Sequence, residues 1–352
     1  MNSFLAYFSR QSRRKLLVIG YLLVLAIFGL DYVTGVEFTF SIFYLIAVFF
    51  VAWFVGKAAG AVISLVSAAA WLLADVLVSP SHLHPIFSTW NTIGMLVFFL
   101  LFNYLLTAFK NALEQEKQMA RKIQLGLLPK SIPPIPGYEI ATAWQPADTV
   151  AGDYFDVLSL NNHAVGLCIA DVSGHGLPAA LLMSNLQAGV KLLATYDTAP
   201  VALCKKLNQL VCSNVAEGNF ITFFYGLLDT ATQSLVYVNA GHNQPLLLHR
   251  DGKISHLDKG GIPLGLEASR QYQQAEVKLC AGDRLVLFTD GLIECINFKD
   301  EVFGQERLLA LLSEHCQLNA DGLKNLVIEA VAEFCQSIYL DDLTLMVMAM
   351  VR

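Results

Sequence analysis

The chain has 352 residues, enough for two domains, and its mean hydropathy of +0.52 is too high for a protein that is soluble throughout. Its net charge of −6 argues against nucleic acid as a partner. The seven cysteines are scattered between Cys168 and Cys335 and form no Cys-x-x-Cys pair, which is typical of reduced thiols in a cytosolic domain.

The N-terminal part predicts a membrane module. Residues 1–15 form a polar, basic cytoplasmic N-terminus, and residues 16–109 contain four apolar segments, each about long enough to cross a hydrocarbon core of roughly 30 Å. The run DYVTGVEFTFSIFYLIAVFFVAWFVG resembles four-span sensor modules fused to bacterial histidine kinases and diguanylate cyclases. We therefore expect a four-helix transmembrane sensor. Its segments are Leu16–Val33, Phe38–Val55, Ala58–Val78 and Thr92–Phe109.

Basic residues fall on one side of this module. They precede the first segment, occur once between the second and third segments at Lys57, and return after the fourth segment from Lys110. The positive-inside rule then puts both ends in the cytoplasm, and the lipid bilayer would be the bacterial inner (cytoplasmic) membrane. Five ionisable residues mark the other side, where they either sit in water at the interface or form a functional site. They are Asp31, Glu37, Asp75, His82 and His84.

Residues 110–136 are predicted to form a helical signalling linker. Apolar residues recur every three or four positions along it, with one charge in the seam, Glu116. This spacing favours a parallel coiled coil in a homodimer, and a plain amphipathic connector is the alternative. Four prolines between Pro129 and Pro136 end the helix. The seam consists of Leu106, Phe109, Leu113, Glu116, Ala120, Ile123 and Leu127.

Residues 137–352 change to short strands separated by helices. Tight returns between the strands favour antiparallel hairpins, so we expect an α/β domain of two antiparallel sheets packed face to face with helices outside. The candidate strands are Tyr138–Trp144, Tyr154–Leu158, Ala164–Ala170, Thr222–Leu228, Leu235–Asn239, Pro245–Leu248, Arg284–Phe288 and Leu343–Met350. The candidate helices are Leu177–Ala194, Pro200–Val215, Glu306–His315 and Ala320–Gln336.

Carboxylates stand at the ends of these candidate strands. Asp153, Asp171, Asp290 and Asp341 each open or close an apolar run, and three of them have a glycine nearby. An aspartate beside glycine is often only a turn residue. Several carboxylates gathered without a cation, however, would force one of them to protonate. Oxygen ligands without a Cys/His set suit Mg²⁺ or Mn²⁺ rather than zinc.

An ordered set of motifs carries a family resemblance. VAGDYFD, ADVSGHG, FFYG, NAGHNQP, LFTDG and DDLTL occur in that order and together resemble the SpoIIE-type (RsbU-type) bacterial serine/threonine phosphatases of the metal-dependent protein phosphatase superfamily. The resemblance covers roughly Ala120 to Arg352. It implies an αββα sandwich, two Mn²⁺ or Mg²⁺ ions, and hydrolysis of phosphoserine or phosphothreonine on a partner protein, with a STAS-type anti-sigma-factor antagonist as that substrate. ARKIQLGLLP resembles the linker that couples input to activity in regulated members.

The same resemblance assigns residues to the metal pair. It implies that Asp171 bridges the two ions and that the backbone carbonyl of Val172 binds beside it. Asp290 and Asp341 match the other metal carboxylates, and Asp153 matches an acid that either binds an ion or supports a ligand. Asp341 is preferred to its neighbour because the family motif begins with the metal aspartate.

Two histidines are candidates with open roles. His175 could donate a proton to the leaving oxygen, but it stands four residues after the metal aspartate instead of two as in the wider superfamily, so a turn role is the alternative. His242, with Asn243, is expected to shape the site. No arginine matches a phosphate-binding one.

Other functions remain as alternatives. A catalytically inactive receptor scaffold that binds a regulatory partner is the main one, and the complete set of metal-site acids argues against it. A transporter is disfavoured because the apolar segments contain few charges.

Overall fold

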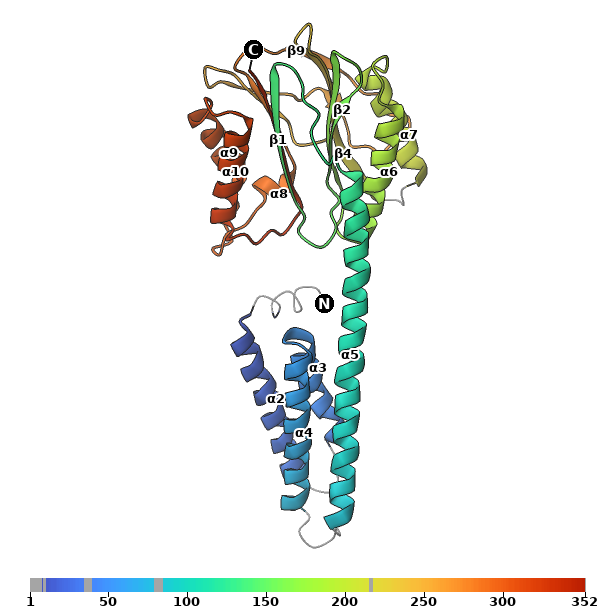
Figure 1. The fold of residues 1–352 in the computed structure, drawn as a ribbon, viewed down its shortest axis with the longest axis vertical. Coiled ribbons are helices and arrows are strands. Elements are labelled where there is room, and N and C mark those ends of the chain that lie inside the picture. Colours follow the sequence, from blue (N-terminus) through green and yellow to red (C-terminus); the bar gives the residue numbers. More distant parts are fainter. Residues whose placement is uncertain (1–7, 9–10, 35–39, 79–84, 215–217, 352) are drawn as a thin grey trace. The chain divides into compact units, whose positions relative to one another are not determined.

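The computed structural model describes residues 8, 11–34, 40–78, 85–214 and 218–351, and the chain divides into two compact units, 1–116 and 117–352 (Figure 1). Glu37, His82 and His84 lie outside the described residues, as does Val215 at the end of a predicted helix.

The first unit is a bundle of apolar helices. A one-turn 3-10 helix, η2 (Ser41–Phe43), leads directly into the short helix α3 (Tyr44–Phe54). Close packing is visible at Gly20, where a Cβ atom would come within 2.2 Å of a Val51 methyl group on the neighbouring helix. The α-helices are α2 (Arg13–Thr34), α3 (Tyr44–Phe54), α4 (Lys57–Val78) and α5 (Pro85–Leu127).

The expected count of four spans is corrected by this unit. Three helices of the described residues, α2, α4 and α5, are long and apolar enough to cross a membrane. The second apolar segment gives only η2 and α3, from Ser41 to Phe54, or about 21 Å of helix. Two local features limit the length of this helical segment. Before it, the Phe40 N–H is bonded to the side chain of Asp31, and after it Gly56 has a φ of +120°.

The second unit contains two sheets. The first has the order β1-β11-β10-β6-β7 and the second β2-β3-β4-β5-β8, with β9 also paired to β5. All pairs are antiparallel except β5–β8, which is parallel. The first sheet comprises β1 (Tyr138–Gln145), β6 (Leu246–Leu248), β7 (Ile254–His256), β10 (Arg284–Phe288) and β11 (Leu343–Met350). The second comprises β2 (Tyr154–Ser159), β3 (Ala164–Val172), β4 (Ile221–Asp229), β5 (Ser234–Ala240), β8 (Gly260–Gly261) and β9 (Ala275–Lys278).

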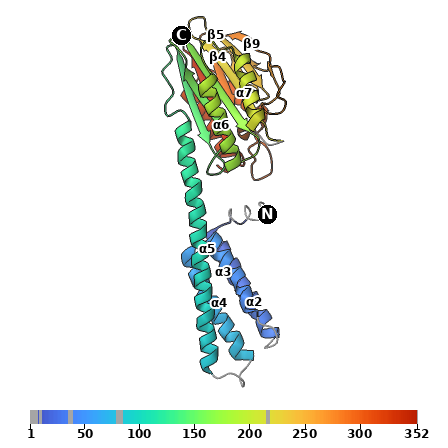
Figure 2. The same ribbon diagram turned by 90° about the vertical axis from the view of Figure 1, so that its right-hand side faces the viewer.

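Helices cover the outer faces of the two sheets. Figures 1 and 2 show α6 (Leu177–Leu193) and α7 (Pro200–Asn214) over the second sheet, and Figure 1 shows α9 (Gly304–Glu314) and α10 (Ala320–Phe334) over the first. One apolar core lies between the sheets and under α6 and α7, and another lies between the first sheet and α9 and α10. The expected α/β domain with two sheets is confirmed. All eight predicted strands are present, whereas β7 to β9 and the one-turn helix α8 (Asp290–Ile293) were not predicted.

Candidate metal centre and active site

Strand register brings the predicted acids to one end of the two sheets. In the second sheet Tyr154 pairs with Ala170, so the preceding Asp153 lies beside Asp171. In the first sheet Phe288 pairs with Leu345, which puts Asp290 and Asp341 at the adjoining ends of β10 and β11. Antiparallel pairing thus gathers residues that are up to 188 positions apart in the sequence.

Asp153 ties the two sheets together. Its Oδ2 atom accepts hydrogen bonds from the hydroxyls of Thr289 (2.8 Å) and Thr344 (2.5 Å). The Thr289 hydroxyl also accepts a bond from the Thr344 N–H at 2.9 Å. Asp153 is fully buried, and its Oδ1 atom has no hydrogen-bond partner. Burial, with the charge of Asp171, raises the pKa of Asp153 well above its ordinary value.

Asp171 lies at the end of β3, immediately before a glycine-rich turn. Gly174 and Gly176 have φ values of +90° and +74°, a conformation that glycine adopts without steric cost. The turn leads into α6, with proline in its first turn. Burial and the charges of Asp290 and Asp341 raise the pKa of Asp171 to about 8. This carboxyl group therefore lies among other negative charges that a cation would neutralise.

Asp290 and Asp341 complete the cluster from the first sheet. Asp290 begins α8, and burial together with the charge of Asp341 raises its pKa to about 6. Asp341 is exposed, and its Oδ1 atom accepts the N–H of Asp342 at 2.8 Å. The carbonyl of Val172 lies beside Gly152, where a Cβ atom would come within 3.1 Å of the carbonyl oxygen.

Asp342 has a different environment from Asp341. It is buried, and its two oxygens accept the N–H groups of Ala147 (2.8 Å) and Gly152 (2.7 Å) in the segment that precedes Asp153. Burial raises the pKa of Asp342 even though these two donors oppose the effect. Because both oxygens are occupied by the backbone, Asp342 shapes the segment, while the Asp341 carboxylate stays accessible.

Gln124, near the end of α5, holds the same segment from another side. Within the second unit its side-chain Nε2 donates to the carbonyl of Ala151 (2.7 Å), and its Oε1 accepts the Ala151 N–H (3.0 Å). Gln124 is buried. Gln187 on α6 donates to the carbonyl of Leu127, which attaches the end of α5 to the domain. The backbone two residues before Asp153 is thus bonded to the linker helix.

Four supporting residues of the site were not predicted from the sequence: Gln124, Thr289, Thr344 and Asp342. The threonines were present in the quoted motifs LFTDG and DDLTL, and the glutamine in ARKIQLGLLP. Their partners, however, come from other strands.

The two histidines lie in contrasting environments. His175 is exposed in the turn between Gly174 and Gly176. His242 is buried and its Nδ1 is 2.8 Å from the Thr222 hydroxyl, which in turn donates to the backbone carbonyl of Asp171. Burial lowers the pKa of His242 to about 4, so a neutral imidazole supports the strand that carries Asp171.

The donor set fits hard divalent cations. It consists of carboxylates and a carbonyl, and it includes the orphaned buried oxygen of Asp153 and acids that raise one another's pKa. Among the described residues, no three carboxylate, imidazole or thiol side chains enclose a point where an ion would fit. Oxygen donors of this kind are the ligands that Mg²⁺ and Mn²⁺ take in proteins.

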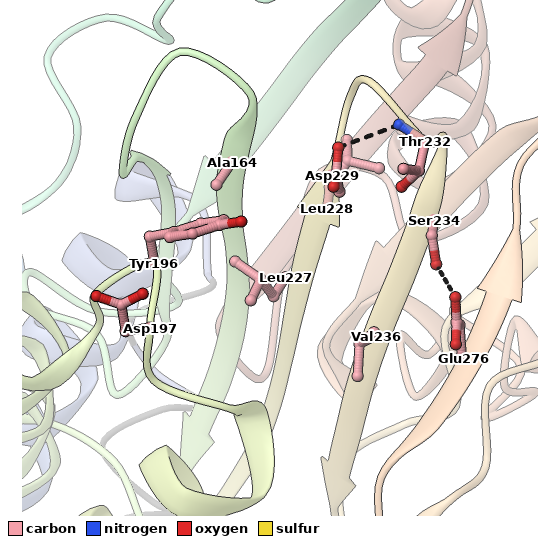
Figure 3. A pocket seen from close by; sticks show the side chains of 10 residues that line it. All are labelled: Ala164, Tyr196, Asp197, Leu227, Leu228, Asp229, Thr232, Ser234, Val236 and Glu276. Carbon is pink, nitrogen blue, oxygen red and sulfur yellow. Dashed lines mark hydrogen bonds between the residues drawn. The ribbon is translucent and has the colours of Figure 1, made fainter.

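A surface cavity of about 450 Å³ lies at the other end of the second sheet. Figure 3 shows Tyr196, from the loop after α6, beside Ala164 and Leu227. Ala164 is seven residues from Asp171 along β3, or about 23 Å. This cavity is consequently separate from the carboxylate cluster.

Comparisons with known proteins agree with the architecture and the motifs. The profile of the family described as Stage II sporulation protein E (SpoIIE) matches residues 161–351. The chain is 28% identical over 244 residues to phosphoserine phosphatase RsbU of Bacillus subtilis, covering 69% of this chain and 72% of that protein. It is 29% identical over 191 residues to phosphoserine phosphatase RsbP of the same organism, covering 53% of this chain and 47% of RsbP.

Solved structures share the fold of the second unit. The SiaA-PP2C domain of Pseudomonas aeruginosa matches with a TM-score of 0.60 and 21% identity, covering 68% of this chain and 98% of that domain. The RsbU and RsbW domains of Rv1364c from Mycobacterium tuberculosis match with a TM-score of 0.55 and 27% identity, covering 64% of this chain and 63% of that protein.

Proposed function

The chain belongs to the SpoIIE family and is homologous to metal-dependent phosphoserine phosphatases, and we propose that it is a membrane-anchored, signal-regulated protein serine/threonine phosphatase. The observation that carries this proposal is the convergence of Asp153, Asp171, Asp290 and Asp341 at one end of the two sheets. These acids have no cationic partner among the described ion pairs.

The proposed roles follow from the positions of these groups. Asp171, Asp290, Asp341 and the Val172 carbonyl hold the ions, and Asp153, fixed by two threonine hydroxyls, supports them from the buried side. Two divalent cations, when bound, supply the Lewis-acid chemistry that activates water for attack on phosphorus. The exposed His175, in the turn after Asp171, is proposed to pass a proton to the leaving serine oxygen.

The substrate is proposed to be a phosphoprotein in a partner-switching system. RsbU and RsbP are named phosphoserine phosphatases, and the Mycobacterium relative combines RsbU and RsbW domains. A phosphoserine of a STAS-type anti-sigma-factor antagonist is accordingly the first substrate to test.

Anchoring in the bacterial inner membrane is supported by the first unit. Its described basic side chains gather at one end: Lys110 donates to the Trp53 carbonyl and lies over the Trp53 ring, and Lys57 begins α4 beside Tyr104. This basic end would face the cytoplasm. The seven cysteines are free thiols, consistent with a cytoplasmic phosphatase unit.

Homodimerisation through the linker helix completes the proposal. On α5 the seam residues Phe109, Leu113 and Ile123 are 64%, 43% and 64% exposed. A second copy of the same helix would bury this stripe, because the seam repeats at heptad spacing.

The test is phosphate release from a phosphorylated STAS-domain protein by the full chain in detergent, with Mn²⁺ or with a chelator. We expect turnover only with the metal, and we expect Asp171→Asn to lower turnover to background while the purified protein stays folded. Wild-type turnover by Asp171→Asn at saturating Mn²⁺ would refute the assigned site. An inert but folded wild type would instead favour a receptor scaffold.

A further inference from the structure

Two segments of the second unit connect directly to the carboxylate cluster. Residues 296–302 form a loop, closed by a bridge between its ends, that follows α8, the helix that begins with Asp290. Residues 336–340 join the end of α10 to Asp341. Each segment is therefore a close neighbour in the chain of an acid of the proposed metal site.

The bases of the two segments are in contact with each other. Cys295 and Cys335, which precede them, are both buried, and their thiols are hydrogen-bonded. The Phe303 N–H, just after the loop, donates to the Cys295 carbonyl at 2.8 Å. The ring of Phe303 packs against the ring of Phe334, the last residue of α10, with the centroids 5.5 Å apart. These contacts hold both segments beside the end of α10.

Hydrogen bonds fix the conformation of both segments. In the loop, Oδ1 of Asn297 accepts the N–H groups of Lys299 (2.8 Å) and Glu301 (3.0 Å). In the second segment, the Ile338 N–H donates to the carbonyl of Cys335 at 3.0 Å. A surface that is already ordered loses little conformational entropy when a partner binds to it.

Large apolar side chains on these two segments are exposed to solvent. Phe298, within the loop, is 76% exposed, and Leu340, directly before Asp341, is 53% exposed. The ammonium group of Lys299 lies over the Phe298 ring, so a charge borders the exposed aromatic side chain. Apolar side chains gathered on a surface and bordered by charges are typical of protein interaction sites. The group, called the apolar patch below, consists of Phe298, Val302, Ile338 and Leu340.

We propose that the apolar patch is the surface on which the phosphoprotein substrate docks, an inference that rests on the phosphatase function proposed above. A protein interface of standard size covers about 800 Å² of each partner. Because a phosphoserine side chain is short, a phosphate held at Asp290 and Asp341 brings the surface of its own protein over the residues beside these acids. Contacts with the patch add affinity for the intact phosphoprotein without acting on the phosphate, and an exposed aromatic such as Phe298 is the side chain best suited to anchor them.

The experiment measures kcat and KM of the full chain in detergent at saturating Mn²⁺ with two probes, a phosphorylated STAS-domain protein and p-nitrophenyl phosphate. We expect Phe298→Ser and Ile338→Ser together to raise the KM for the phosphoprotein by about tenfold or more. For p-nitrophenyl phosphate, kcat, KM and the Mn²⁺ concentration at half-maximal turnover should stay as in wild type, because this small substrate reaches only the acids. Each single variant should show part of the increase.

Leu192→Ser is the matched control for loss of an exposed apolar side chain. Leu192 is 79% exposed near the end of α6, 15 residues or about 22 Å along the helix from Leu177 at its start. This variant should behave as wild type toward both probes.

The outcomes separate this inference from the proposed function. A wild-type KM for the phosphoprotein in the double variant would overturn the docking surface and leave the phosphatase function intact. An equal loss on both probes would also contradict it, because the substitutions would then act on the acids themselves. Turnover of p-nitrophenyl phosphate alone by wild type would show that the STAS-domain protein is not the occupant, and turnover of neither probe would remove the proposed function together with the inference.

Discussion

At the scale of single residues, the neighbouring Asp341 and Asp342 have different roles. Asp341 is exposed, whereas the oxygens of Asp342 are bonded to the backbone of Ala147 and Gly152. Asp341→Asn should abolish Mn²⁺-dependent turnover and change the free energy of unfolding by no more than about 0.5 kcal/mol. Asp342→Asn loses one acceptor for a buried N–H and should destabilise the protein by about 1–3 kcal/mol.

Chemical denaturation and turnover, measured on both variants side by side without and with Mn²⁺, distinguish these duties. If Asp341→Asn is destabilised while Asp342→Asn is stable but inactive, Asp342 is the metal ligand and Asp341 supports the backbone.

His242 should leave a signature in the pH dependence of stability. Its pKa is about 4 in the folded protein against 6.5 ordinarily. Between these values the unfolded chain binds the proton and the folded chain does not, so stability falls as the pH drops from 6.5 to 4. Because a shift of one pKa unit corresponds to roughly 1.4 kcal/mol, the free energy of unfolding should fall by about 3 kcal/mol over this pH range.

The free energy of unfolding of wild type and of His242→Gln is measured by urea denaturation between pH 6.5 and pH 4. The carboxylates titrate in both proteins, so their contribution cancels in the comparison. The variant should lose the His242 part of the slope. His163→Gln removes an exposed imidazole and serves as the control. Identical slopes for wild type and His242→Gln would show that the imidazole is not buried in its neutral form.

At the scale of elements, the end of α5 is bonded to the segment that carries Asp153. Gln124→Ala would leave the N–H and carbonyl of Ala151 without partners in a buried place, with an expected cost of about 1–3 kcal/mol. Because Ala151 is two residues from Asp153, we also expect lower turnover at saturating substrate. Lys122→Ala, on an exposed position of the same helix, is the control.

Turnover and KM, measured over a range of Mn²⁺ concentrations, test whether the change acts through the metal site. A Gln124→Ala protein that is destabilised but has wild-type turnover and Mn²⁺ dependence would restrict this residue to a structural role.

At the scale of the whole molecule, the proposed dimer rests on one long helix. Among the seam residues, Glu116 is the only charged one, and it is exposed in the single chain. Pairing two chains would bring two such charges together, which is costly. Glu116→Leu should therefore tighten the dimer, and if two pairings of the helix control activity it should also change turnover.

Sedimentation equilibrium in detergent and phosphate release, measured on the same preparations, test this prediction. Glu114 lies on the same helix and outside the seam, so Glu114→Leu is the control for added hydrophobicity. A tighter Glu116→Leu dimer with unchanged turnover would make the linker a tether and not a switch.

The sequence by itself determined the class of both parts of the molecule. Long apolar runs separated by basic residues indicate membrane helices, because twenty apolar residues have few other stable environments in a cell. The strands were predictable because apolar runs such as Ala164–Ala170 and Leu343–Met350 begin or end beside an aspartate. The acids at their ends carried the family resemblance.

Tertiary structure decided which of these residues meet. Thr344 reaches Asp153 across 191 positions and Asp342 reaches Gly152 across 190, and such contacts follow from strand register and sheet packing, which no local pattern encodes. The strands β7 to β9 escaped prediction because a few residues carry too little periodicity, and α3 is shorter than the predicted segment Phe38–Val55. The side chains of Asp31 and Tyr44 meet for the same reason, since the two helices α2 and α3 must pack before these residues become neighbours.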